Sequence, residues 1–206
     1  MPTHRFAVLV AMSVRLAIRL VTAVRADWRD GAPPPAPCIY FANHASHLDF
    51  GLLWAVLPAA IRPHVRPVAA ADYWCGGPIR RFLAEQVFHA VLVERTRGAS
   101  AGCPIELMAD ALDRGASLVL FPEGTRNDTN QPLLAFRSGL SRLLAVRPAV
   151  TCVPVWIANA SSVLPKGAWL PVPLLCTVTF GAPLHLTGDD YASLAKRVED
   201  AVRSLD

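Results

Sequence analysis

The sequence has little charge and almost no lysine. Only 17% of its 206 residues are charged, and arginine supplies 18 of the 20 basic side chains. The formal net charge is +4. This balance favours an anionic partner, such as a membrane surface, a phosphorylated substrate or nucleic acid.

Long uncharged apolar runs are also missing, although 53% of the residues are hydrophobic and the mean hydropathy is +0.34. The longest candidate, from Phe6 to Val24, is interrupted by Arg15 and Arg19. A membrane-spanning helix needs about 20 predominantly apolar residues, so no clean span is expected. No small-residue cleavage site precedes Arg15, so a secretory signal is not expected either.

The five cysteines form no C-x-x-C pair, which argues against a zinc or dithiol redox motif. We expect buried thiols in a reducing compartment. The sequence also lacks internal repeats and low-complexity tracts, and its length suits one domain with a sizeable core.

Residues 4–29 have the pattern of a basic amphipathic helix. Arg5, Arg15 and Arg19 fall on one broad side of the helical wheel, and apolar side chains such as Phe6 lie on the other. The helix either lies in a membrane interface, with its arginines at the headgroups, or packs on its own domain with a solvated basic face. We expect the first, at the cytoplasmic face of a membrane, in a peripheral or monotopic position.

The proline-rich segment 30–37, DGAPPPAP, is expected to end this helix. The predicted division is therefore an interface helix over 1–29, a stiff linker over 30–37 and a catalytic domain over 38–206. In the last part, apolar runs alternate with helical patterns, which predicts a single α/β domain with a mixed, mostly parallel sheet flanked by helices. The expected strands are 38–42, 65–70, 87–93, 117–121, 151–157 and 175–180. The expected helices are 49–57, 77–85, 101–114, 138–146 and 189–204.

The first polar cluster is NHASHLD, residues 43–49, between two apolar runs. His44 and Asp49 are five apart, so within one regular helix their side chains would diverge by roughly 140°. They can meet only if His44 precedes a helix that begins near Asp49, with Ser46 as a candidate N-cap. A carboxylate beside an imidazole fixes its tautomer and leaves the other ring nitrogen free to take a proton from a hydroxyl.

Two other interpretations of this cluster stay open. One is a capping turn whose polar groups are satisfied locally. The other is an H-x-x-H-x-D metal site of His44, His47 and Asp49, although the spacing matches no strong zinc motif. We expect no metal.

A second polar cluster follows an expected buried strand in LVLFPEGTR, residues 118–126. Gly124 permits close approach of the backbone to a ligand, and Arg126 offers a planar fork suited to phosphate. Glu123 would repel a phosphate, so it is expected to orient an arginine or accept a hydrogen bond from a substrate hydroxyl. The alternative is an ordinary turn with a surface ion pair. Arg95 closes another expected strand.

These clusters together resemble the glycerolipid acyltransferases, the family of 1-acylglycerol-3-phosphate acyltransferases. NHASHLD resembles the family's H-x4-D motif, and FPEGTR is identical to its phosphate-binding motif. Arg95 in VERTRG is at the place of a further block, VPVWI (153–157) resembles another, and FRSG (136–139) is similar to an F-K-x-G element. The resemblance covers roughly residues 38–182.

The resemblance implies residue roles. His44 would be the general base and Asp49 its orienting partner. Residues implied around the phosphate and glycerol of the acceptor are Arg95, Glu123, Gly124, Thr125 and Arg126. The family often carries a lysine near AAADYWCGGPIRR, residues 69–81, where Arg80 and Arg81 would supply the charge here.

The implied reaction moves an acyl group from acyl-CoA or acyl carrier protein to a lysophospholipid, with 1-acyl-sn-glycerol-3-phosphate as the leading acceptor. Other lysophospholipids and ornithine-type lyso-lipids are the alternative acceptors. No cofactor and no nucleic-acid partner are expected. Two alternatives of other classes are a metal-dependent hydrolase using His44, His47 and Asp49, and a lipid-binding module without catalysis. The second is disfavoured because a binding module needs no base.

Overall fold

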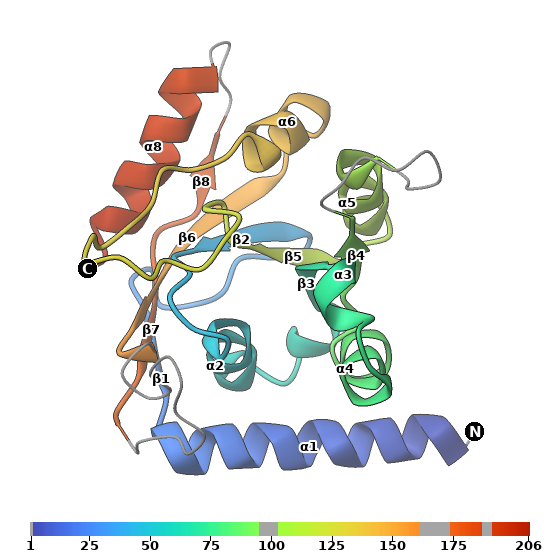
Figure 1. The fold of residues 1–206 in the computed structure, drawn as a ribbon. Coiled ribbons are helices and arrows are strands. Elements are labelled where there is room, and N and C mark those ends of the chain that lie inside the picture. The colour runs from blue at the N-terminus through green and yellow to red at the C-terminus, as the bar shows by residue number, and fades with distance from the viewer. Residues whose placement is uncertain (1, 95–102, 161–173, 187–190) are drawn as a thin grey trace.

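One sheet lies at the centre of the computed structural model, with helices on both of its faces (Figure 1). The structure describes residues 2–94, 103–160, 174–186 and 191–206. Within them the strand order is β1-β7-β6-β2-β5-β3-β4, and β8 pairs with β6. The strands are β1 (Arg25–Trp28), β2 (Cys38–Ala42), β3 (Val65–Ala70), β4 (Val91–Val93), β5 (Ser117–Leu120), β6 (Thr151–Ala158), β7 (Thr177–Phe180) and β8 (Leu184–His185).

The middle of this sheet is parallel. β2 lies between β5 and β6 and runs parallel to both, and β3 and β4 continue the parallel part. β6 pairs antiparallel with β7 and β8. All five side chains of β2 are buried, because a parallel strand is covered on both faces. The predicted α/β domain with a mixed, mostly parallel sheet is confirmed.

The helices cover the two faces in separate groups (Figure 1). On one face, Met108 of α5 and Leu143 of α6 pack against Ile39 in one apolar cluster. On the other, Leu52 of α2 joins Tyr40 in a second cluster. The helices are α1 (Pro2–Thr22), α2 (Asp49–Val56), α3 (Ala71–Trp74), α4 (Pro78–Phe82), α5 (Pro104–Asp113), α6 (Gly139–Val146) and α8 (Tyr191–Arg203), with the short turns η1 (Arg62–His64) and η2 (Leu83–Val87).

Helix α1 packs Val14 and Ile18 against the domain and exposes other large apolar side chains. Ala7 is buried, and α1 approaches α2 so closely that a Cβ on Gly51 would come within 3.0 Å of Ile18 Cδ1. Leu9 and Leu16 are exposed, as is Arg5. The exposed surface therefore carries arginines and large apolar side chains together, instead of the predicted arrangement on opposite sides. In the described part of the chain, no helix combines the length and hydropathy needed to cross a membrane.

The predicted helix over 4–29 ends early. Helix α1 stops at Thr22, Ala23 has a φ of 44°, and residues 25–28 form β1 at the edge of the sheet. β1 pairs in parallel with β7, and the Trp28 ring stacks on Phe180 at a centroid distance of 3.7 Å. Pairing with a strand some 150 residues away is invisible to a helical wheel, which explains the miss.

The predicted strand over 87–93 is also shorter than expected. Only residues 91–93 form β4. The preceding residues form the π-helical turn η2, with Phe88 N–H donating to Leu83 O, and His89 has a φ of 49°. Phe88 is buried in a small cluster with Trp54 beside α1. Its apolar character serves this contact between helices and not the sheet.

Candidate active site

The turn after β2 brings His44 and Asp49 together. The distance from His44 Nδ1 to Asp49 Oδ2 is 2.8 Å. Asp49 is the first residue of α2, as the five-residue spacing requires, and its Oδ2 also accepts the N–H groups of Ala45 and Ser46. Ser46 is not the N-cap, which is Leu48; the Ser46 hydroxyl oxygen accepts the Leu48 N–H instead.

The two side chains differ in exposure. The Asp49 side chain is 1% exposed and that of His44 is 23% exposed. With Nδ1 donating to the carboxylate, the neutral ring keeps its lone pair on Nε2. The His44 ring also stacks on Phe121, with centroids 4.4 Å apart. Asp49 and Phe121 together hold the imidazole in one orientation.

Glu123 anchors the loop after β5 to the His44 turn. Its Oε1 accepts the His44 backbone N–H at 2.6 Å, and its Oε2 accepts the Leu134 N–H at 2.9 Å. The Asn127 N–H donates in turn to the His44 carbonyl. These contacts follow from the topology, because the loops after neighbouring parallel strands leave the sheet at the same edge.

Glu123 is buried in this position. It is 2% exposed, and both of its carboxylate oxygens accept backbone N–H groups. Burial raises the pKa of the Glu123 carboxyl above its ordinary value, while the N–H groups of Leu134 and His44 act in the opposite direction.

Gly124 lies directly against Arg137. Its φ is +68°, and a Cβ at this position would approach Arg137 Cδ to 2.6 Å. Only glycine takes this backbone conformation without strain while leaving room for the guanidinium-bearing chain. The Arg137 N–H donates to the Pro122 carbonyl, which ties the FRSG segment to the loop after β5.

His47 points to a different partner from His44. Its ring stacks on Tyr73 at 5.5 Å, and the Arg80 guanidinium lies 4.7 Å from the centroid of the same Tyr73 ring. Burial lowers the pKa of His47, and the charge of Arg126 lowers it further. Among the described residues, no group of three or more His, Cys, Asp or Glu side chains is placed to hold a metal ion.

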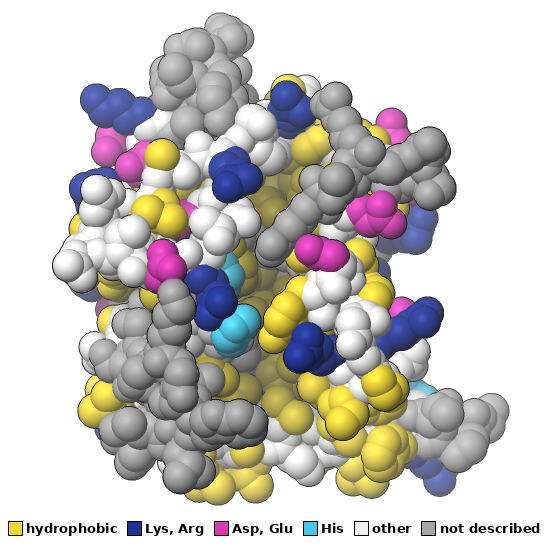
Figure 2. Space-filling view, in the orientation of Figure 1, with side chains coloured by type: hydrophobic (Ala, Val, Ile, Leu, Met, Phe, Trp, Pro, Cys, Tyr) yellow, Lys and Arg dark blue, Asp and Glu magenta, His cyan; other side chains and the backbone are white. Residues whose placement is uncertain are grey.

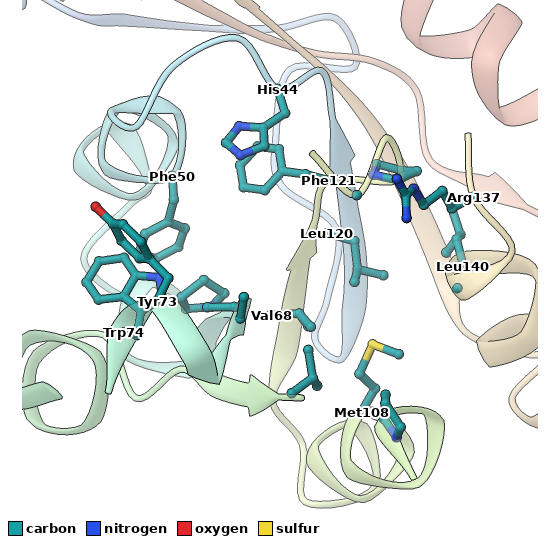
Figure 3. Close-up of a pocket in the computed structure, with 18 of the residues that line it drawn as sticks. His44, Phe50, Val68, Tyr73, Trp74, Met108, Leu120, Phe121, Arg137 and Leu140 are labelled. Atoms are coloured by element: carbon teal, nitrogen blue, oxygen red, sulfur yellow. The ribbon is translucent and has the colours of Figure 1, made fainter. Parts of the chain in front are cut away.

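These residues surround a cavity of about 530 Å³. Figure 2 shows it as a hollow with hydrophobic side chains on its floor and histidine and arginine side chains beside it. His44 and Phe121 lie next to each other in the lining, and Arg137 lies apart from them (Figure 3). Met108 is part of the apolar floor. Val68, Leu120 and Leu140 extend that floor.

The other predicted site residues are placed as follows. Arg126 lines the cavity, and Thr125 is exposed beside it in the loop. Arg95 lies outside the described residues. Of the two arginines expected to replace a lysine, Arg80 stacks on Tyr73, whereas Arg81 is paired with Glu85 at the surface.

Sequence reasoning left most of the lining residues out of the site, among them Arg137, Tyr73 and Trp74. The similarity of FRSG to an F-K-x-G element pointed to Arg137, but the sequence analysis assigns no role to this residue. Tyr73 and Trp74 line the cavity beside His47, and only the interrupted family pattern in residues 69–81 pointed to that region. The VPVWI segment lies in β6 and holds the residue before His44. The Asn43 side-chain amide pairs with the backbone N–H and carbonyl of Ile157.

Comparison with known proteins finds lipid acyltransferases among the relatives of this chain. The 1-acyl-sn-glycerol-3-phosphate acyltransferase of Limnanthes alba is 26% identical over 175 residues, which cover 81% of this chain and 56% of the relative. The lyso-ornithine lipid O-acyltransferase of Pseudomonas aeruginosa is 31% identical over 144 residues, covering 70% of this chain and 50% of the relative. The chain thus spans about half the length of the curated relatives it matches.

Among solved structures, the crystal structure of the 1-acyl-sn-glycerophosphate acyltransferase PlsC from Thermotoga maritima has a TM-score of 0.74. The match covers 97% of this chain and 79% of that chain at 21% identity, so it establishes the fold. The family model described as "Acyltransferase" matches residues 24–158, which include both the His44 turn and the loop after β5. The resemblance seen in the sequence is confirmed, and the chain belongs to this acyltransferase family.

Proposed function

We propose that the protein transfers an acyl group from a thioester donor to the free hydroxyl of a lysophospholipid. The observation that carries the proposal is the His44–Asp49 pair, joined at 2.8 Å beside a cavity with arginines on its lining and an apolar floor. A proton acceptor, a site for an anion and space for a hydrocarbon chain are the parts that this reaction needs.

In the proposed mechanism His44 is the general base. Its Nε2 takes the proton of the acceptor hydroxyl, and the oxygen attacks the carbonyl carbon of the thioester. The C–S bond then breaks, and the imidazolium returns the proton to the departing thiolate. Asp49 holds the ring in the required tautomer and stabilises the imidazolium.

The acceptor headgroup is proposed to lie against Arg126 and Arg137. Both line the cavity, and a guanidinium pairs with a phosphate through two parallel hydrogen bonds. Gly124, Thr125 and Arg95 are proposed to complete this side of the site. Glu123 is proposed as a positioning residue, because it holds the backbone of His44. The names of the Limnanthes and Thermotoga proteins favour 1-acyl-sn-glycerol-3-phosphate as acceptor and phosphatidic acid as product.

A lyso-ornithine lipid is the second candidate acceptor. It is favoured by the 31% identity to the Pseudomonas aeruginosa enzyme of that name. Such a headgroup presents a carboxylate in place of the phosphate, which arginine also binds in a fork. Both acceptors present a hydroxyl to His44, so the chemistry at the base is the same.

The donor is proposed to place its acyl chain on the apolar floor formed by Val68, Met108 and Leu120. The carrier is coenzyme A or acyl carrier protein. No cofactor takes part in the proposed reaction, and no nucleic acid is a partner.

The protein is proposed to work at the cytoplasmic face of a membrane, where a lysolipid resides. Support comes from the large apolar side chains that α1 exposes, among them Leu9, Leu16 and Leu20. An amphipathic helix of this kind lies in the interface plane. In this view α1 is the interface segment, and the part from residue 38 onward carries the catalysis.

The test is lipid mass spectrometry on the purified full chain. It is incubated with mixed acyl thioesters and, in parallel, with 1-acyl-glycerol-3-phosphate and a lyso-ornithine lipid. A diacyl product that appears with the wild type and not with the His44→Ala variant supports the proposal. Thioester hydrolysis without any acylated lipid would contradict it, and the relative yields decide between the two acceptors.

A further inference from the structure

A second cavity lies between α1 and the body of the domain. This α1 groove has a volume of about 780 Å³. It is lined by Arg15 and Arg19 of α1, Trp54 of α2, Arg62 of η1 and Phe88 after η2, among others. No lining residue is shared with the catalytic cavity, and none of the lining residues is an Asp or Glu.

The three arginines of this groove hold few partners of their own. Arg15 Nε donates to the Ala55 carbonyl at 3.0 Å, and an Arg62 terminal nitrogen donates to the Leu57 carbonyl at 2.6 Å. The Arg62 Nε is buried and has no hydrogen-bond partner within the described residues. None of the ion pairs in the described part of the chain includes Arg15, Arg19 or Arg62. Their positive charge is therefore uncompensated.

The arginines are also close enough to act on one another. Burial lowers the pKa of Arg62, and the charges of Arg15 and Arg19 lower it further. Like charges at this distance repel one another in the folded protein. An anion bound among them would relieve this repulsion. It would also accept hydrogen bonds from the guanidinium N–H groups that do not donate to the Ala55 and Leu57 carbonyls.

The surroundings of the cluster match a lipid better than a free anion. Met12 and Leu16 line the same groove and are 64% and 58% exposed. Arginines that hold their charge at headgroup depth beside aliphatic side chains suit the boundary of a bilayer. An acidic protein would match the charge but would leave these apolar side chains in water.

We propose that the α1 groove binds the phosphate of a bilayer phospholipid headgroup through Arg15, Arg19 and Arg62, separately from the catalytic cavity. The inference rests on the proposed position of α1 in the membrane interface. It adds a defined headgroup site to that position, and the site sets the depth and orientation at which the catalytic cavity meets the bilayer.

The test compares two kinds of vesicle that are both electrically neutral, so that surface potential does not contribute. One is made of phosphatidylcholine, which carries a phosphate, and the other of digalactosyldiacylglycerol, which carries none. Sedimentation is measured for the full-length wild type, for Arg19→Gln and for Arg5→Gln. Arg19 and Arg5 are both exposed on α1, but only Arg19 lines the groove, so Arg5→Gln is a control of equal charge on the same helix.

We expect the wild type to bind phosphatidylcholine vesicles more tightly than galactolipid vesicles by roughly fivefold or more. Arg19→Gln should lose most of this preference, whereas Arg5→Gln should keep it. Arg62→Lys, which retains the charge but not the fork, should lie between them, and melting curves establish that each variant is folded. Equal binding to the two vesicles by the wild type would overturn the proposal, as would an equal loss in both glutamine variants.

Further measurements test other ligands for the α1 groove and distinguish the groove proposal from the proposed catalytic function. Tight binding of inorganic phosphate without vesicles, abolished by Arg19→Gln, would assign the groove to a free anion and overturn the lipid proposal. If Arg19→Gln loses binding to acyl carrier protein but binds vesicles like the wild type, the lipid proposal is also overturned. Acyl transfer to a water-soluble short-chain lysolipid should be the same in Arg19→Gln and wild type, so that a failure of the groove proposal is distinguishable from a failure of the catalytic one.

Discussion

At the scale of single residues, His44 and His47 provide a matched pair of histidines three positions apart. Only His44 contacts Asp49, whereas His47 stacks on Tyr73. We expect His44→Ala to lower the acyl-transfer rate by ~10²–10⁴-fold, the usual contribution of a general base. His47→Ala should cost far less, and Asp49→Asn should be severe because an amide does not fix the tautomer in the same way.

Steady-state rates with a radiolabelled thioester give the measurement, and circular dichroism melting establishes that each variant is folded. An equal loss in the two histidine variants would show that the roles within the NHASHLD turn are assigned wrongly.

Arg126 tests where the acceptor binds. It lines the catalytic cavity, whereas Arg142 of α6 is exposed and does not. Arg126→Ala is expected to raise the KM for a phosphate-bearing acceptor more than the KM for the thioester donor, and Arg126→Lys should restore little because a point charge lacks the bidentate fork. Arg142→Ala should leave both KM values unchanged. A similar rise of both KM values in Arg126→Ala would instead place this residue at the donor or in a structural role.

The pKa of His47 reports the same neighbourhood without any substrate. Burial and the Arg126 charge both lower it from the ordinary value, so the unfolded chain binds this proton more readily than the folded one. Stability therefore falls as the pH drops below about 6.5. Arg126→Gln should move the pKa of His47 upward in an NMR titration, while Arg142→Gln should leave it in place. An unchanged value in Arg126→Gln would mean that the guanidinium is not near the ring.

At the scale of elements, β1 shows how an edge strand is held. Among the described strands it pairs only with β7, and Trp28 stacks on Phe180, whose side chain is fully buried. Trp28 is only half-buried, so Trp28→Ala should lower the free energy of unfolding by about 2–3 kcal/mol, less than the ~3–5 kcal/mol of a fully buried tryptophan. Urea denaturation measures this change.

The control for β1 lies on α1. Leu20 is 74% exposed, so Leu20→Ala should change the free energy of unfolding by no more than about 0.5 kcal/mol. A comparable loss in the two variants would mean that the exposed side of α1 is covered in solution, for example by another copy of the chain.

At the scale of the whole molecule, the exposed apolar surface is unevenly distributed. Leu16 and Leu20 of α1 are 58% and 74% exposed. Helices α5 and α6 lie on the opposite face of the sheet from α1 (Figure 1). A double variant with Leu16→Ser and Leu20→Ser should weaken binding to neutral vesicles by roughly tenfold or more, since each leucine loses its contact with acyl chains.

The matched control changes Leu107 of α5 and Val146 of α6 to serine; these side chains are 39% and 47% exposed. It should bind vesicles like the wild type. If the control weakens binding as much as the α1 variant, the membrane meets a different face of the molecule.

The sequence alone determined the local parts of this protein. The five-residue spacing of His44 and Asp49 required a turn followed by a helix, because a continuous helix separates the two side chains, and the structure has that arrangement. The buried strand CIYFA was equally readable, since an apolar run bounded by turn residues has few other solutions. Interactions over a few residues leave a periodicity or a spacing that can be recognised in one dimension.

Tertiary structure decided the contacts between distant segments. Glu123 holds His44 across 79 residues, and this contact exists because β2 and β5 are neighbours in the sheet. Arg137 reaches Gly124 because the segment between β5 and α6 folds back on itself, with the Arg137 N–H donating to the Pro122 carbonyl. Strand β1 forms by pairing with β7. The outward direction of Leu9 and Leu16 on α1 depends on which side chains fit against α2. Such choices depend on strand order and on packing volume, and neither has a period in the sequence.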